Sequence, residues 1–191
     1  MIINPVSYSE LEDGIGYIKL NEFSQTAAIE TRRALSAFNK EGINRIILDL
    51  RNNPGGLLDQ AVKIAKEFVP QGPIVHIRER NTSLLTYSSY SSVPDYDLVV
   101  LVNGNSASAS EILAGAIRDR NAGILIGEQT YGKGIVQSII PLENGSLIKM
   151  TTAEYLTPKY RNIHGIGIVP DIVVENTYGV DLQLERAIEE L

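Results

Sequence analysis

The sequence of 191 residues contains no cysteine and only two histidines, His76 and His164. Without cysteine the chain can form no disulfide, offer no thiolate nucleophile and bind no Cys-ligated zinc. Two histidines are too few for a typical His-based metal centre. These absences remove several classes of catalytic site before any motif is considered.

The sequence also lacks clusters of basic residues, with 17 Lys and Arg against 23 Asp and Glu and a formal net charge of −6. A nucleic-acid partner is therefore not expected. Residues 1–14 contain neither the basic segment nor the apolar core of a signal peptide. Because no apolar run approaches membrane-spanning length, we expect no membrane segment and a chain that is soluble as written.

The sequence does contain an alternation of predicted strands and helices, and it is long enough for one core-bearing domain over residues 1–191. Repeated β–turn–α units indicate an α/β fold with a mostly parallel sheet covered by helices. Residues 82–94 are polar and predict a loop or an edge element. Apolar runs and periodicity predict strands at 14–20, 45–50, 73–77, 98–103 and 123–127, helices at 26–39, 57–69, 109–119 and 181–191, and a hairpin at 135–140 and 146–152.

Two glycine-containing turns follow the two most apolar predicted strands. One covers residues 52–56 (NNPGG), the other covers 104–108 (GNSAS), and both lead directly into helices. Reactive groups gather at the carboxyl ends of strands in such sheets, and a helix N-terminus offers free N–H groups. Two such turns close together could stabilise an oxyanion.

The second turn carries a run of hydroxyl groups, in the segment Ser106-Ala107-Ser108-Ala109-Ser110-Glu111. Spacing alone favours N-capping, because serine is a preferred cap and Glu111 lies where a capping-box acid can lie. The alternative interpretation is that Ser108 is a nucleophile.

A further segment at residues 127–134 (GEQTYGKG) resembles a phosphate-binding loop but departs from it at the last position. Gly134 stands where that loop needs a hydroxyl for magnesium, and residues 135–140 predict a strand rather than the required helix. We therefore discount a nucleotide-hydrolysing enzyme. Lys133 is then either a solvated loop lysine or a desolvated lysine that serves as a base.

Other charged residues have structural interpretations. Asp49 and Arg51 flank the end of a buried strand and are expected to pair there. Glu111 is expected to cap the following helix and to complement its dipole. His76 and His164 are expected at the surface or in packing.

Several separated motifs resemble the carboxyl-terminal processing (tail-specific) serine protease family, over residues 14–191. Their order along the chain is that of the family. The motifs are DLRNNPGG at 49–56, SASASEI at 106–112, GKG at 132–134 with Gln137, TTAEY at 151–155 and GIGIVPD at 165–171.

The resemblance implies a catalytic Ser–Lys dyad. Ser108 would be the nucleophile, Lys133 the general base, and Gln137 would hold Lys133 by a hydrogen bond. An amine must be neutral to accept a proton, which requires desolvation or nearby positive charge because the reference pKa of lysine is about 10.4.

The resemblance also implies an oxyanion hole formed by the backbone N–H of Ala109 and that of Gly55 or Gly56, with the choice between the two glycines left open. It implies a crotonase/ClpP-like peptidase core that cleaves polypeptides with free C-termini near those ends, through an acyl-enzyme intermediate. It implies no metal and no cofactor.

The family usually places a PDZ domain before the segment matched by residues 14–20, together with a signal or membrane anchor. Neither is expected in residues 1–191. The resemblance suggests an extracytoplasmic location, in the periplasm, at the cell envelope or secreted, and a homo-oligomer is left open.

Two other functions fit the same predicted fold. One is a non-proteolytic or regulatory peptide-binding domain, against which the complete set of Ser108, Lys133 and Gln137 argues. The other is a crotonase-type enzyme acting on acyl-CoA, which would need no Ser–Lys pair.

Overall fold

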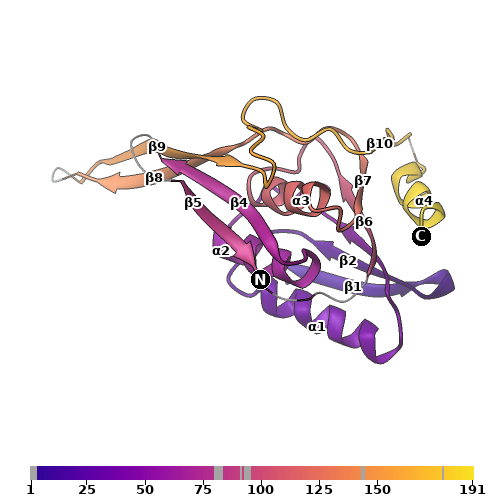
Figure 1. The fold of residues 1–191 in the computed structure, drawn as a ribbon. Coiled ribbons are helices and arrows are strands. Elements are labelled where there is room, and N and C mark those ends of the chain that lie inside the picture. Colours follow the sequence, from indigo (N-terminus) through magenta and orange to yellow (C-terminus); the bar gives the residue numbers. More distant parts are fainter. Residues whose placement is uncertain (1–3, 80–83, 91, 93–95, 143–144, 178) are drawn as a thin grey trace.

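The structure is a computed structural model that describes residues 4–79, 84–90, 92, 96–142, 145–177 and 179–191. These residues form a six-stranded sheet, a four-stranded sheet and four α-helices (Figure 1). No helix among them has both the length and the apolar character needed to cross a membrane.

The larger sheet is mostly parallel. The two strands at one edge pair antiparallel, and every other neighbouring pair is parallel. Its central strands carry unbroken apolar runs, which is typical of strands covered on both faces. In spatial order the strands are β1 (Val6–Leu11), β2 (Ile15–Leu20), β3 (Arg45–Asp49), β6 (Asp97–Val102), β7 (Ile124–Gly127) and β10 (Ile172–Val173).

Helices cover both faces of this sheet. Successive side chains of a strand point to opposite faces, so Leu48 belongs to the core on one side and Ile47 to a smaller cluster on the other. The first side is covered by α1 (Ala27–Lys40), α2 (Leu58–Phe68) and α3 (Ala109–Asp119), and the second by α4 (Leu182–Glu189).

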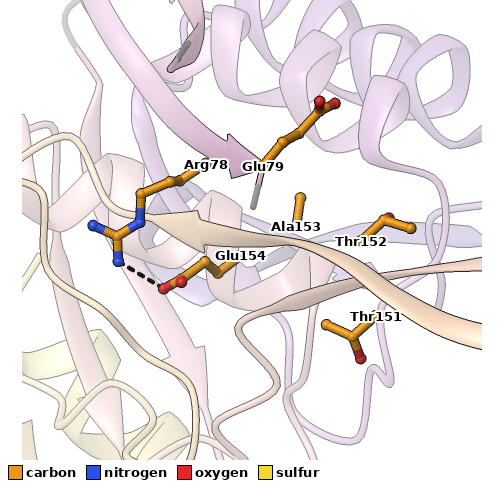
Figure 2. Close-up of a pocket in the computed structure, with 6 residues that line it drawn as sticks. All are labelled: Arg78, Glu79, Thr151, Thr152, Ala153 and Glu154. Atoms are coloured by element: carbon orange, nitrogen blue, oxygen red, sulfur yellow. Dashed lines mark hydrogen bonds and ion pairs between the residues drawn. The ribbon is translucent and has the colours of Figure 1, made fainter. Parts of the chain in front are cut away.

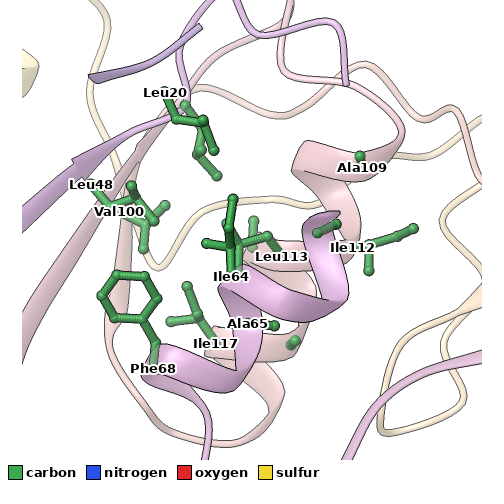
Figure 3. Packing of buried hydrophobic residues seen from close by; sticks show 14 of the residues in the cluster. Leu20, Leu48, Ile64, Ala65, Phe68, Val100, Ala109, Ile112, Leu113 and Ile117 are labelled. Carbon is green, nitrogen blue, oxygen red and sulfur yellow. The ribbon is translucent and has the colours of Figure 1, made fainter. Parts of the chain in front are cut away.

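The main core lies where α2 and α3 meet the strands. Figure 3 shows Ile64 and Phe68 of α2 and Ile117 of α3 directed toward Leu48 and Val100. All five side chains are buried. The helix α3 begins at Ala109, directly after the second predicted turn.

The smaller sheet is antiparallel and packs on the other side of α2 and α3. Its strands, in spatial order, are β5 (Leu85–Ser89), β4 (Gly72–Glu79), β9 (Leu147–Leu156) and β8 (Ile135–Pro141). The β8–β9 hairpin extends away from the rest of the molecule (Figure 1). The inner end of β9 returns to the core, where Ala153 and Tyr155 are buried.

The predicted mixed α/β fold is confirmed, with two corrections. The predicted hairpin is present as the antiparallel pair β8–β9. The strand predicted at 73–77 belongs to the antiparallel sheet rather than to the parallel one. The edge strand β1 was not predicted. Within residues 82–94, β5 confirms the predicted edge element, while residues 82–83, 91 and 93–94 lie outside the described residues. The finer crotonase/ClpP-like assignment stays a prediction.

The predicted pair of Asp49 and Arg51 is confirmed at the end of β3. Arg51 donates to both carboxylate oxygens of Asp49, from Nε at 3.0 Å and from Nη2 at 2.8 Å. Lys19 lies 3.0 Å from the same carboxylate, and the Tyr17 hydroxyl donates to it at 2.6 Å. Burial alone would raise the pKa of Asp49, but hydrogen bonds from Arg51 and the charge of Lys19 outweigh burial and hold it below its usual range.

Arg51 also connects β3 to the C-terminal helix. Its Nη1 group donates to Asp181 at 2.6 Å and to Gln183 at 3.2 Å. Asp181 is the N-cap residue of α4 and accepts the N–H of Leu184 at 3.1 Å. The buried charge of Arg51 thereby fixes α4 against the sheet.

Replacement of Asp49 by asparagine should lower the free energy of unfolding by about 3 kcal/mol at pH 7, because Arg51 and Lys19 would lose their buried counter-ion. The pKa of Asp49 is lower in the folded state, so its stabilisation is present above the ordinary aspartate pKa of about 4 and is lost as pH falls through the folded-state pKa. The deficit of Asp49→Asn should therefore shrink in acid. Urea unfolding at several pH values measures this.

The matched control is Asp59→Asn, which removes an exposed aspartate paired with Lys63. It should change stability by less than about 1 kcal/mol. If Asp49→Asn cost no more than Asp59→Asn, the buried network would not stabilise the fold.

Candidate active site

The two glycine-containing turns lie side by side at the carboxyl ends of β3 and β6, as predicted. Ala107 donates its N–H to the carbonyl of Asn53 at 3.1 Å. The Ser110 hydroxyl donates to the same carbonyl at 2.9 Å, and the Ser106 hydroxyl donates to the Leu50 carbonyl at 2.9 Å. Ser106 and Ser110 therefore join the two turns, which corrects the capping interpretation for these two serines.

Ser108 is the N-cap residue of α3 and has an unusual backbone conformation, with φ 56° and ψ −112°. A positive φ is uncommon outside glycine and indicates local strain that the surrounding structure must maintain. Glu111 accepts the N–H of Ser108 at 2.9 Å, which confirms Glu111 as a capping acid. Ser108 is only partly buried.

Gly55 and Gly56 approach this turn closely. A Cβ atom on Gly55 would lie 2.8 Å from the Ala107 carbonyl oxygen and 3.0 Å from the backbone nitrogen of Ala109. The N–H of Gly55 donates to Asn53 Oδ1 at 2.9 Å. For the N–H groups of Gly56 and Ala109, the described part of the chain provides no hydrogen-bond acceptor.

Lys133 lies in the loop between β7 and β8, and Glu111 holds the backbone of that loop. Gly132 and Lys133 donate their N–H groups to the two oxygens of Glu111, at 2.7 and 2.8 Å. The carboxylate that accepts the N–H of Ser108 therefore also binds the backbone of the predicted base. The Lys133 side chain is partly buried.

Gln137 lies on β8, opposite Thr151 of β9, next to an irregularity in strand pairing between Val136 and Gln137. Its side chain is exposed. No hydrogen bond among the described residues joins the side chains of Ser108, Lys133 and Gln137. The structure thus brings the loops of Ser108 and Lys133 together and places Gln137 on the adjoining strand.

A second loop, residues 163–168, packs against the backbone of the Lys133 loop. A Cβ atom on Gly132 would lie 2.9 Å from the Gly167 nitrogen, and one on Gly134 would lie 2.7 Å from the His164 nitrogen. Gly132 also accepts the N–H of Gly165 at 2.9 Å. The glycines on either side of Lys133 therefore permit close backbone packing.

Two residues that the sequence did not single out also lie at this site. Thr130 donates to Glu111 at 2.6 Å and is buried. Tyr155 of β9 lies near Ser108; burial raises the pKa of Tyr155, and its interaction with the Ser108 side chain only partly offsets that effect. Both residues stand inside segments already noted, 127–134 and 151–155, but only the fold brings them to Glu111 and Ser108.

A surface pocket of about 440 Å³ lies on the smaller sheet, beside the strand that carries Gln137. Figure 2 shows the ion pair between Arg78 and Glu154 at one side of it, with a distance of 2.9 Å. Neither Ser108 nor Lys133 lines this pocket. The lining residues are Arg78, Glu79, Thr151, Thr152, Ala153 and Glu154.

Residues 14–174 match the model of a protein family described as peptidase family S41. The chain is 44% identical over 177 residues to the carboxyl-terminal-processing protease of Picosynechococcus sp., and 40% identical over 201 residues to that of Synechocystis sp.. These alignments cover 90% and 98% of this chain but 42% and 47% of the relatives. The chain thus spans about half the length of the curated relatives it matches.

Solved structures of other proteins also resemble this chain. The photosystem II D1 C-terminal processing protease superposes with a TM-score of 0.84 at 35% identity, covering 92% of this chain and 49% of that one. Mature CPAF superposes with a TM-score of 0.71 at 13% identity, covering 88% of this chain and 49% of that one. The second likeness concerns the fold alone.

Replacement of Gly132 by alanine should destabilise the protein more than the same change at Gly145. Both glycines have positive φ, 88° and 83°, so each substitution should cost about 1 kcal/mol of backbone strain. Only Gly132→Ala adds a clash, because nothing lies within 4 Å of a Cβ on Gly145. We expect a total loss of about 3 kcal/mol for Gly132→Ala in urea unfolding. Equal losses would show that the loop has room to move.

Proposed function

The chain belongs to peptidase family S41, and on that premise we propose that it is the catalytic core of a serine endopeptidase that cleaves polypeptides near their C-termini. The observation that carries the proposal is the shared carboxylate of Glu111. It binds the backbone N–H of Ser108 and that of Lys133, at 2.9 and 2.8 Å. A nucleophile and a base on separate loops can act together only if those loops are held in register.

In the proposed reaction the neutral amine of Lys133 accepts the hydroxyl proton of Ser108 as the oxygen attacks the scissile carbonyl carbon. The tetrahedral intermediate collapses to an acyl-enzyme, and Lys133 returns the proton to the departing amine. Water then attacks the ester as Lys133 takes its proton, and the second tetrahedral intermediate collapses as Lys133 returns that proton to the departing Ser108 oxygen, which releases the new C-terminus and restores the dyad. Each step conserves charge without a metal or a cofactor.

The oxyanion of the intermediate needs N–H donors that are not already used. Ala109 is the first residue of α3, so its N–H has no partner within the helix. Gly55 donates to Asn53, whereas no acceptor is found for Gly56 among the described residues. This difference favours Gly56 as the partner of Ala109 and leaves Gly55 as the residue that permits the close approach of the two turns.

Gln137 is proposed to orient the amine of Lys133. The register of the strand pair shifts between Val136 and Gln137, and irregularities of this kind can redirect a side chain next to an active site. A neutral amide can accept a hydrogen bond from the amine without favouring the ammonium form as strongly as a carboxylate would. The proposal requires this exposed side chain to turn toward Lys133 when a peptide occupies the site.

A non-proteolytic peptide-binding domain on the same fold is the competing function. The observation that favours it is the absence of a side-chain hydrogen bond between Ser108 and Lys133 in the described structure. Catalytic hydrogen bonds often form only when substrate is bound. An activity measurement is therefore needed to distinguish the peptide-binding domain from a peptidase, because the geometry of the unbound site does not distinguish them.

We expect Ser108→Ala and Lys133→Ala each to reduce cleavage of an unfolded protein substrate by at least a thousandfold, because an activated nucleophile and its base act as a unit. A serine-directed phosphonate should label the wild type and fail to label Ser108→Ala. Mass spectrometry of the digestion products and of the labelled protein measures both effects.

The controls are Ser36→Ala and Lys159→Ala, which alter exposed residues outside the site. Both should retain wild-type cleavage and labelling. Cleavage by either dyad variant at more than about a tenth of the wild-type rate would contradict the Ser–Lys mechanism. A folded wild type that binds peptides but neither cleaves nor becomes labelled would establish the competing function.

A further inference from the structure

Glu111 is fully buried, and its carboxylate accepts four hydrogen bonds. Three come from backbone N–H groups of Ser108, Gly132 and Lys133, and one comes from the Thr130 hydroxyl. The four distances lie between 2.6 and 2.9 Å. A deprotonated carboxylate is an acceptor only, so this set of donors matches it at every contact.

This environment exceeds what helix capping needs. A capping acid needs only the N–H of the N-cap residue, which here is Ser108. The other three donors belong to the loop of Lys133, about twenty residues further along the chain, and no Lys or Arg side chain pairs with Glu111 in the described residues. Burying a carboxylate is costly unless it is fully hydrogen-bonded. The two loops together supply the bonds that keep it there.

Thr130 extends the arrangement to the supporting loop of residues 163–168. Its hydroxyl donates to Glu111 at 2.6 Å and accepts the N–H of Ile168 at 2.7 Å. Its own N–H donates to the Ile168 carbonyl at 3.1 Å. A single hydroxyl therefore connects the carboxylate to a third segment.

We propose that Glu111 and Thr130 are positioning residues, which form a hydrogen-bonded link from the Ser108 turn through the Lys133 loop to Ile168 and so set the separation of nucleophile and base. This inference rests on the proposed function of Ser108 and Lys133. Neither Glu111 nor Thr130 touches the reacting atoms in this scheme. Their effect passes through the backbone of the residues that do.

The scheme makes the hydroxyl of Thr130 more important than its shape. Thr130→Val keeps the volume but removes the donor to Glu111 and the acceptor for Ile168. Because a displacement of about 1 Å can reduce a rate a hundredfold, we expect kcat to fall between ten- and a hundredfold, with KM changed less than about twofold. The rate of phosphonate labelling at Ser108 should fall by the same factor. Thr130→Ser retains the hydroxyl and should keep kcat within about threefold of wild type. If Thr130 only filled space, the smaller serine would not perform better than valine.

The matched control is Asp119→Asn, at the other end of α3. Asp119 is also a buried carboxylate of this helix, and it accepts the backbone N–H of Lys159 at 2.9 Å. Its loss should lower the melting temperature but leave kcat within about twofold of wild type, because no hydrogen bond joins it to the Ser108 or Lys133 loops. Glu111→Gln is the second test variant. One carboxylate oxygen becomes an NH₂ group, which would face a backbone N–H donor and could not accept its hydrogen bond.

Amide hydrogen exchange at Gly132 and Lys133 provides a readout that does not depend on activity. Exchange there should be at least tenfold faster in Thr130→Val and Glu111→Gln than in Asp119→Asn. An active wild type with unchanged kcat and unchanged exchange in Thr130→Val would overturn the inference. An inactive wild type with accelerated exchange in Thr130→Val would overturn the proposed peptidase function and support the structural link.

Discussion

The carboxylate of Glu111 is the interaction on which the geometry of the candidate site depends. Its two oxygens lie a fixed, short distance apart, so the donors from the Ser108 turn and from the Lys133 loop must converge on one small volume. Glycine is required at position 132 for a separate reason, because a Cβ atom there would lie 2.9 Å from the Gly167 nitrogen and 3.0 Å from the Ile166 nitrogen.

A second constraint acts on the opposite side of the Ser108 turn. Asn52 and Asn103, at the ends of β3 and β6, exchange hydrogen bonds of 2.9 and 3.0 Å. Arg51, the residue before Asn52, is fixed by Asp49 and by Asp181 of the C-terminal helix. The position of the glycine turn therefore depends on a buried ion network whose partners come from both ends of the chain. A charge change in that network would act on the site through the backbone of residues 51–56.

The sequence predicted those parts of the fold whose signal is local. Each of four elements can be recognised from its own residues, without knowledge of its partners. These are the apolar strands β3 and β6 and the amphipathic helices α2 and α3, and the structure confirms them. The pairing of β4 with β9 could not be predicted, because His76 pairs with Leu156 across 80 residues and periodicity does not specify a partner. The edge strand β1 has four exposed residues and no continuous apolar run, so it gave little signal.

The same distinction applies to the site. Ser108 and Lys133 belong to compact motifs and could be selected from the sequence, and Glu111 could be recognised as a capping acid because its first partner is three residues away. Its partners in the Lys133 loop, Thr130, Gly132 and Lys133, lie about twenty residues further along the chain and become visible only in three dimensions. The cause is physical, since hydrogen bonds between loops depend on how the two sheets are packed around α3.

Tyr155 shows how the smaller sheet contributes to a site at the carboxyl ends of the central strands β3 and β6 of the larger one. Its N–H donates to the Gly134 carbonyl at 2.8 Å, next to Lys133, and its side chain lies near Ser108. Tyr155 of β9 is thus hydrogen-bonded to the loop of Lys133 through its backbone, separately from Glu111. The same strand pairs with β8 at Gln137. Because the backbone of β9 is hydrogen-bonded to the loop of Lys133 and to the strand of Gln137, a displacement of the β8–β9 hairpin would reach both of these predicted catalytic residues through the backbone.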